Sequence, residues 1–114
     1  MISFSFSKKL FADLQKRFPD GEYEDGVLIT KALKLGLDEK LEPGLIKSEY
    51  WDAKNCRPFY ISKSSELRLK SLLNTRLEID PAATLASVAG GVIAAVASSN
   101  EDDKAAGQHT SLHS

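Results

Sequence analysis

The first residues of the chain alternate strictly between apolar and hydroxyl side chains. The apolar positions are Ile2, Phe4 and Phe6, and the serines that alternate with them are Ser3, Ser5 and Ser7. Successive side chains of a β-strand point to opposite faces, so a period of two residues is typical of a strand. The pattern therefore predicts a strand over residues 2–7 with one apolar face and one hydroxyl face.

Two helices are expected after this strand. Ser7 is a candidate N-cap, and apolar residues then recur at helical spacing until Pro19-Asp20-Gly21 ends the first helix. An acidic loop follows over residues 22–26. The second helix is expected from Val27 to Leu37, where leucine and isoleucine side chains share one face. Residues 1–38 are thus predicted to form a first strand-helix-helix unit.

Residues 39–56 are expected to connect this unit to a second one, which covers residues 57–98. Residues 57–62 fit a short strand, whose Phe59 and Ile61 are expected to share one core layer with Phe4 and Phe6. A helix follows, for which Ser62 is a candidate N-cap. Asp80-Pro81 has the form of a helix start, because proline fits the first helical position. Residues 99–114 are polar and show no periodicity, so we expect a disordered tail there.

The two units align when Ser7 is set on Ser62, an offset of 55 residues. Strand, cap, helix, loop and helix then follow in the same order in each unit. The expected fold class is mainly α with a short antiparallel two-stranded ribbon, in which β-α-α occurs twice. The alternative is one such unit followed by an unrelated helical hairpin.

The last apolar segment, residues 85–97, has small side chains at a spacing of four. These are Ala86, Gly90 and Ala94. Two adjacent glycines, Gly90 and Gly91, destabilise a helix interior by roughly 1 kcal/mol each relative to alanine, so they need a compensating contact. We expect this helix to pack closely through Gly90 against another helix. The segment is shorter than the roughly 20 residues of a membrane span.

Composition favours one globular domain in a reducing compartment. The chain has 114 residues, of which 42% are hydrophobic and 27% charged. Cys56 is the single cysteine, so neither a disulfide framework nor a cysteine metal cluster is expected. The N-terminus lacks the basic and apolar regions of a signal peptide. We expect a cytoplasmic protein that does not enter membranes.

The sequence contains no pattern of an enzyme active site. We find no Gly-rich phosphate loop, no nucleophile elbow and no pair of carboxylates placed for acid-base work. His109 and His113 are four residues apart but have no third ligand in the tail. The protein is therefore expected to be no enzyme and to hold neither a metal nor another cofactor.

The arrangement resembles the ribbon-helix-helix superfamily, the Arc/MetJ-type DNA-binding proteins. The resemblance covers residues 2–37 most clearly and residues 57–97 less completely. In that superfamily two strands form a ribbon and four helices cover its apolar face, in a homodimer or, with tandem copies, in a single-chain pseudo-dimer. The resemblance implies that the ribbon enters the major groove of double-stranded DNA, as in transcriptional regulators and accessory factors.

The resemblance also implies which residues would meet DNA. The outward positions of the ribbon are Ser3, Ser5 and Ser7 on the first strand and Pro58, Tyr60 and Ser62 on the second. The cations that flank the ribbon and could reach phosphates are Lys8, Lys9, Arg57 and Lys63. Members of the superfamily usually carry longer polar side chains on this face, so serines predict weaker and less sequence-specific contacts.

A second departure concerns the start of the second helix of each unit, where the superfamily binds phosphate. Here the first start is preceded by Glu22, Glu24 and Asp25, and the second has Asp80. Carboxylates at these places cap helices and repel phosphate. The alternative function is therefore a protein-interaction module with the same fold, in which the acidic loop, Tyr50 and Trp51, or the tail contacts a partner.

Charge around the ribbon separates the two functions. Residues 1–76 carry 14 of the 15 lysines and arginines against 11 of the 16 acidic residues, a modest excess. A cluster of the four flanking cations on one face favours DNA. Coverage of that face by the acidic loop favours the interaction module.

Overall fold

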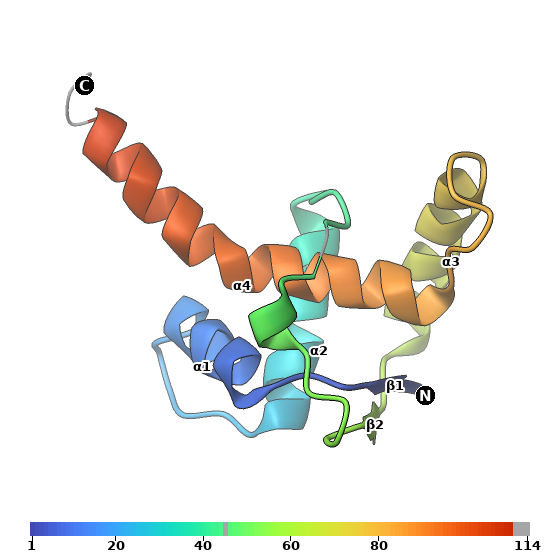
Figure 1. Cartoon of the computed structure of the whole chain (residues 1–114), viewed down its shortest axis with the longest axis horizontal. Coiled ribbons are helices and arrows are strands. Elements are labelled where there is room, and N and C mark those ends of the chain that lie inside the picture. Colours follow the sequence, from blue (N-terminus) through green and yellow to red (C-terminus); the bar gives the residue numbers. More distant parts are fainter. Residues whose placement is uncertain (45, 111–114) are drawn as a thin grey trace.

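The described part of the chain, residues 1–44 and 46–110, contains four α-helices and a two-stranded sheet in the computed structural model (Figure 1). Side chains are described as far as Ser99, except at position 45. In chain order the elements are β1 (Ile2–Phe4), α1 (Lys8–Arg17), α2 (Asp25–Asp38), the 3-10 helix η1 (Ser48–Tyr50), β2 (Arg57–Phe59), α3 (Lys63–Leu77) and α4 (Leu85–Thr110). The mainly helical fold with a short ribbon is confirmed.

Strands β1 and β2 pair antiparallel within the one chain. Ile2 lies opposite Phe59, Ser3 opposite Pro58 and Phe4 opposite Arg57. Pro58 has no N–H, so the backbone hydrogen bonds run through the two outer pairs and not through the central one. Both strands are shorter than expected, because the pairing ends at Phe4 and Phe59.

The apolar face of the ribbon lies at the centre of the core. Phe4 and Phe6 are 3% and 1% exposed, and their rings stack with centroids 4.8 Å apart. The Phe59 ring lies 6.1 Å from that of Phe4. These three phenylalanines form the single layer that the sequence predicts. Ile61, expected in the same layer, lies past the end of β2 and is only partly buried.

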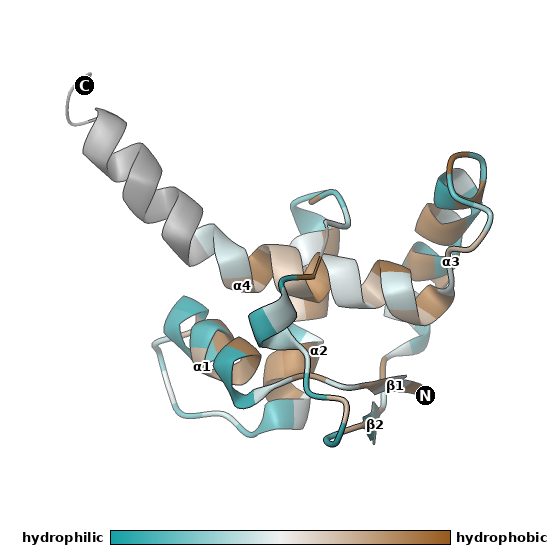
Figure 2. Ribbon diagram, in the orientation of Figure 1, coloured by the Kyte–Doolittle hydropathy of each residue, from teal (hydrophilic) through white to brown (hydrophobic). Residues whose placement is uncertain are grey.

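Helix α4 is the central helix of the fold. It contacts α1, α2, α3 and β1, and Figure 1 shows it lying across α1 and α2 with α3 at its N-terminal end. Every residue from Val88 to Ala97 except Ala95 is buried. A helix that is apolar all round has to be surrounded by other elements. Figure 2 shows the complementary pattern in α1, which has one hydrophilic and one hydrophobic side.

Helices α2 and α4 approach each other closely at Gly36 of α2, which was not expected from the sequence. A Cβ at Gly36 would overlap Cγ1 of Val92 on α4. The expectation for Gly90 was wrong, because its space is filled by Ile46 of the connector, 3.1 Å from an added Cβ, and by Phe4 and Phe6. The contacts that offset the destabilising effect of Gly90 on the helix come from Ile46 of the connector and from Phe4 and Phe6, and not from another helix.

Helix α4 begins later than expected. Asp80 accepts a hydrogen bond from the Ala82 N–H at 3.1 Å, but this closes a turn and not a helix. The helix starts after Thr84, whose hydroxyl accepts from the Ser87 N–H at 3.1 Å while the Ser87 hydroxyl accepts from the Thr84 N–H at 2.9 Å. This reciprocal pair satisfies two backbone donors at once. It replaces Asp80-Pro81 as the start signal.

The two candidate N-caps behave differently. Ser62 is confirmed, since its hydroxyl accepts a hydrogen bond from the Ser65 N–H at 3.2 Å. Ser7 stands at the N-cap position of α1, but its hydroxyl makes no capping bond and donates to the Glu49 carbonyl at 2.6 Å. Ser7 therefore joins the connector to the segment that follows β1.

The backbone of α4 continues to Thr110, into the segment for which a disordered tail is predicted. Residues 111–114, the rest of that segment, lie outside the described residues. Within the described part of the chain, none of the helices combines the length and apolar character that a bilayer crossing requires.

Candidate functional site

The outer ribbon face is only partly open. Ser3, Pro58, Tyr60 and Ser62 are exposed, Tyr60 at 81%. Lys8 and Lys63, at the first positions of α1 and α3, are exposed as well. Ser5 and Ser7 are half-buried. Six of the nine predicted DNA-contacting residues are therefore exposed, and three of these six carry no charge. The six are Ser3, Lys8, Lys9, Tyr60, Ser62 and Lys63.

The connector hydrogen-bonds to both edges of the strand segment that continues β1. The Ser7 N–H donates to the Tyr50 carbonyl at 2.9 Å, and the Asp52 N–H donates to the Ser5 carbonyl at 2.7 Å. The Asn55 side chain donates to the carbonyl of Phe6, between these serines, at 3.0 Å. Backbone groups of neighbouring strand residues point to opposite edges. Residues 50–52 therefore lie along one edge, and Asn55 lies along the other with β2.

Residues 52–57 consequently cross this strand segment, and Figure 1 shows the connector crossing the chain between β1 and α1. Phe4 and Phe6 occupy the inner side together with Phe11 and Gly90, so the crossing lies over the outer side, where Ser5 is half-buried. The crossing covers part of the outer side of the segment that follows β1 and leaves Ser3 and Pro58 of the ribbon exposed.

Two of the four predicted phosphate contacts are engaged within the protein. The Arg57 guanidinium pairs with the Asp25 carboxylate at 2.8 Å and lies over the rings of Phe11 and Phe59, 5.4 and 5.2 Å from their centroids. Lys9 pairs with Asp13 at 3.1 Å. Arg57 faces the core side of the ribbon because it alternates with Pro58 and shares a face with Phe59.

Acidic residues lie beside the ribbon. Glu24 shares a shallow hollow of about 480 Å³ with Val27 and Lys31 of α2 and with Pro58 and Tyr60 of the ribbon. Glu24 lines this hollow and Asp25 pairs with Arg57, so this part of the acidic loop lies beside the ribbon. The four predicted cations therefore do not form one free basic cluster.

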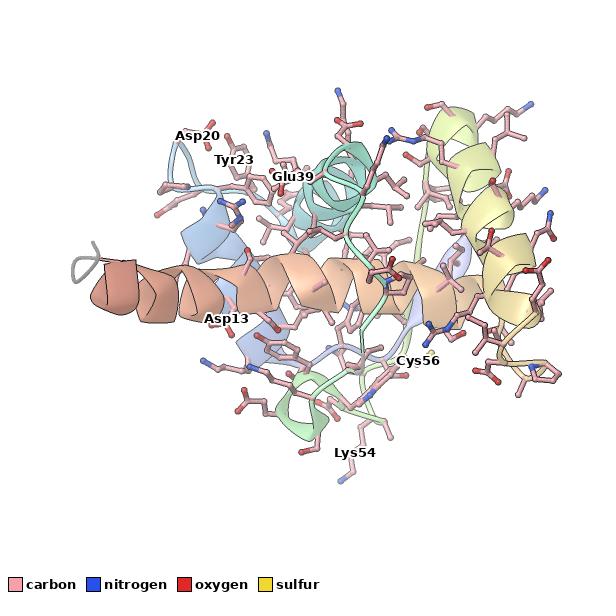
Figure 3. All side chains as sticks on the ribbon, turned by 90° about the horizontal axis from the view of Figure 1, so that it is seen from above. Asp13, Asp20, Tyr23, Glu39, Lys54 and Cys56 are labelled. Carbon is pink, nitrogen blue, oxygen red and sulfur yellow. The ribbon has the colours of Figure 1, made fainter. Side chains whose placement is uncertain are left out.

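The acidic loop has a defined position because one side chain holds it. Gln15 donates to the carbonyls of Phe18 and Gly21 at 3.0 and 2.6 Å, and its own carbonyl accepts from the Tyr23 N–H at 3.0 Å. The Tyr23 hydroxyl donates to Asp20, 2.8 Å away, and the two lie together in Figure 3. That bond lowers the pKa of the Asp20 carboxyl and raises the pKa of the Tyr23 phenol.

A buried polar pair, which the sequence analysis missed, fastens the connector to α1. The Tyr50 hydroxyl donates to the Asp13 carboxylate at 2.6 Å, and the two residues are 0% and 5% exposed. Burial raises the pKa of the Asp13 carboxyl, but the hydrogen bonds from Tyr50 and Lys9 and the nearby lysine charges outweigh it and hold the pKa below its usual value. The sequence signal for this pair is Asp13 itself, an acidic residue that lies between Leu10 and Leu14 on the apolar face of α1.

We expect Tyr50→Phe to reduce the free energy of unfolding by roughly 1.5–3 kcal/mol at neutral pH, because it removes a hydrogen bond to a buried charge. The Asp13 pKa is depressed in the folded state, so its contribution is present above the unfolded pKa of about 3.9 and is lost as the pH falls through the folded value. Urea unfolding of both proteins from pH 7 to pH 3 should show the difference shrinking below pH 4. A difference that stays constant would contradict this role.

A second surface is a groove beside α3, which we call the α3 groove. Three adjoining cavities of about 400, 110 and 320 Å³ form it, and Pro43 lines all three. In Figure 1 the loop after α2 and helix α3 rise on the same side of α4. The residues that line it include Leu41, Glu42 and Pro43 on the loop, Leu72 and Arg76 on α3, and Ile79 after α3.

The walls of the α3 groove combine aliphatic side chains with one arginine. Ile79 is 77% exposed, and Leu41 and Leu72 are partly buried. Arg76 lines two of the three cavities and makes no ion pair with any residue that the structure describes. Figure 2 shows hydrophobic segments on α3 and on the loop that follows it.

Helix α3 buries fewer residues than α1. Leu69 is the one buried residue of α3, whereas α1 buries Leu10, Phe11, Asp13 and Leu14. At the offset of 55 residues, Ser65 and Glu66 stand where α1 has Leu10 and Phe11. On α3, Leu72 and Leu73 are partly buried against the core, and Leu67 is exposed.

The described side chains contain no group of three or more potential metal ligands. Cys56 is exposed on the connector near Lys54, whose side chain points away from the body of the protein in Figure 3. The side chains of His109 and His113 lie outside the described residues. No protein family, curated protein or solved structure matches this chain, so the assignment of a function depends on the geometry of its surfaces.

Proposed function

We propose that the protein is a non-enzymatic protein-interaction module built as a single-chain pseudo-dimer of two β-α-α units. The offset of 55 residues carries β1 (Ile2–Phe4) onto β2 (Arg57–Phe59) and the first residue of α1 onto that of α3. In the ribbon, Ser3 pairs with its counterpart Pro58. This is the arrangement expected when a two-fold axis passes through the middle of the ribbon.

The observation that carries the interaction function is the α3 groove with its exposed aliphatic walls. Ile79 is 77% exposed and lines one of the three cavities together with Pro43 and Leu72, and exposed aliphatic side chains grouped in this way are typical of a surface that a partner covers. The outer ribbon face, by contrast, is crossed by the connector and flanked by carboxylates. The ribbon serves to hold the fold together, and the groove serves binding.

The test is a selection of displayed random peptides on the immobilised protein. We expect the enriched peptides to lose binding to Ile79→Asp, which places a charge in the α3 groove, and to keep it on Leu67→Asp. Leu67 is a matched control because it is 67% exposed on α3 and lines none of the three cavities. Peptides that bind both variants equally, or no enrichment at all, would speak against the module.

DNA binding is the second candidate, favoured by the exposed Lys8 and Lys63 at equivalent helix starts. With Lys9 and Arg57 engaged in ion pairs, two phosphate contacts remain, which corresponds to a slope of about −2 in log K against log salt. Fluorescence anisotropy with random duplex at low salt measures it. A slope of about −2 that disappears in the double variant Lys8→Ala with Lys63→Ala supports DNA binding. No binding at tens of micromolar protein rules DNA binding out.

A further inference from the structure

The centre of the α3 groove differs from its walls in chemistry. Arg76 lines both the narrow cavity next to Leu72 and Ile79 and the wider one next to Trp51. Arg76 as a residue is half-buried and forms no ion pair with a carboxylate among the described residues. An arginine in an apolar groove gains most from a carboxylate, which it can bind with two parallel hydrogen bonds.

The aliphatic residues lie on both sides of this arginine. Leu72 is one helical turn before Arg76 on α3, and Ile79 follows three residues after it, while Leu41 and Pro43 stand on the opposite wall. Glu42 on the loop and Asp80 after α3 each line a cavity that Arg76 also lines, and neither of them forms an ion pair with Arg76. A ligand that fits has aliphatic groups at its ends and a negative charge between them.

The other arginine of the groove is already satisfied. Arg68 pairs with Asp38 at 2.8 Å across the gap between α3 and α2, so it ties the two walls together. Arg76 has the equivalent position two turns further along α3, where the opposite wall offers it no such partner. The contrast between these two arginines on one helix points to Arg76 as the place where a partner supplies the missing carboxylate.

From this contrast we infer that the α3 groove binds an acidic amphipathic peptide segment of a partner protein, whose aliphatic side chains contact Leu72 and Ile79 and whose carboxylate pairs with Arg76. The inference rests on the proposed interaction function and specifies its partner. The insertion of an amphipathic segment into an apolar groove is a common mode of peptide recognition.

The experiment uses two designed peptides with the same leucines at helical spacing, one with glutamates and one with lysines at the polar positions. We expect the glutamate peptide to bind and to shift the amide signals of α3 and of residues 40–44 in NMR spectra. Arg76→Gln should weaken its binding about tenfold, the usual effect of losing one charge-assisted contact. Lys70→Gln, which removes an exposed cation from α3 outside the groove, should leave binding unchanged.

Each other outcome overturns the inference in a recognisable way. Equal binding of the lysine peptide, or equal loss in Arg76→Gln and Lys70→Gln, would show that Arg76 does not select a carboxylate. If the peptides selected from the random library depend on Ile79 but not on Arg76, the partner chemistry is wrong while the interaction module stands. If no peptide depends on Ile79, the module itself fails.

Discussion

Replacing Phe6 by alanine is expected to destabilise the protein by roughly 3–5 kcal/mol, the cost of removing a large buried aromatic side chain and leaving a cavity. Phe6 is 1% exposed, stacks on Phe4 at 4.8 Å and meets Phe11 edge to face at 6.3 Å. Its ring also lies 6.0 Å from that of Trp51 on the connector. The ribbon segment, α1 and the connector would all lose contacts at once.

Urea unfolding gives the measurement, through the midpoint at an unchanged slope. Tyr60→Ala is the matched control, because Tyr60 is a ribbon aromatic that is 81% exposed and its removal should change the free energy of unfolding by less than about 0.5 kcal/mol. A loss below about 1 kcal/mol for Phe6→Ala would show that the aromatic layer does not form as described.

Replacing Gly36 by alanine is expected to destabilise the protein by roughly 1–3 kcal/mol, the usual cost of adding a group to a filled core. The sign is the informative part, since glycine to alanine in an unhindered helix stabilises by roughly 1 kcal/mol. Here the added Cβ overlaps Val92 and comes within 3.2 Å of Val96, both buried and stiff at χ1. Helices α2 and α4 would have to separate.

Gly26→Ala provides the control within the same helix. Gly26 lies in the first turn of α2, and a Cβ there meets nothing within 4 Å. That variant should be as stable as the original protein or more stable, by up to about 1 kcal/mol. If both alanine variants change the melting temperature in the same direction, the close approach of α2 and α4 at Gly36 is not real.

The ribbon and its apolar layer could be predicted from the sequence because they depend on local alternation. Ile2, Phe4 and Phe6 have a period that only a strand satisfies, and Ser62 has the local hydrogen bond of an N-cap. The start of α4 was misjudged because two cap signals lie four residues apart, and Thr84 with Ser87 forms the reciprocal pair that Asp80 cannot. Local sequence rules do not show which of two neighbouring cap signals begins the helix.

Features that depend on residues far apart in the chain could not be predicted. Arg57 looks like a free cation in sequence, and only folding brings Asp25 within 2.8 Å of it. Gly36 carries no sequence mark that distinguishes it from Gly90, because the difference lies in which residues of α4 face it. The α3 groove likewise forms between α3 and the loop after α2, which lie far apart in the sequence. Its position and the lack of an ion pair at Arg76 therefore depend on the folded chain.

The crossing of the ribbon by the connector has a consequence for the order of folding. Residues 5–7 hydrogen-bond to residues 50–55 and β1 pairs with β2, so the ribbon closes a loop of about 50 residues. Long-range pairings form late, because the chain entropy lost on closing a loop precedes the contacts that offset it, whereas helices form locally and fast. On the ribosome, the first strand is made well before its partner. Ile2, Phe4 and Phe6 therefore stay without their strand partner until residue 59 has left the exit tunnel, and this interval is when the growing chain is most prone to aggregate.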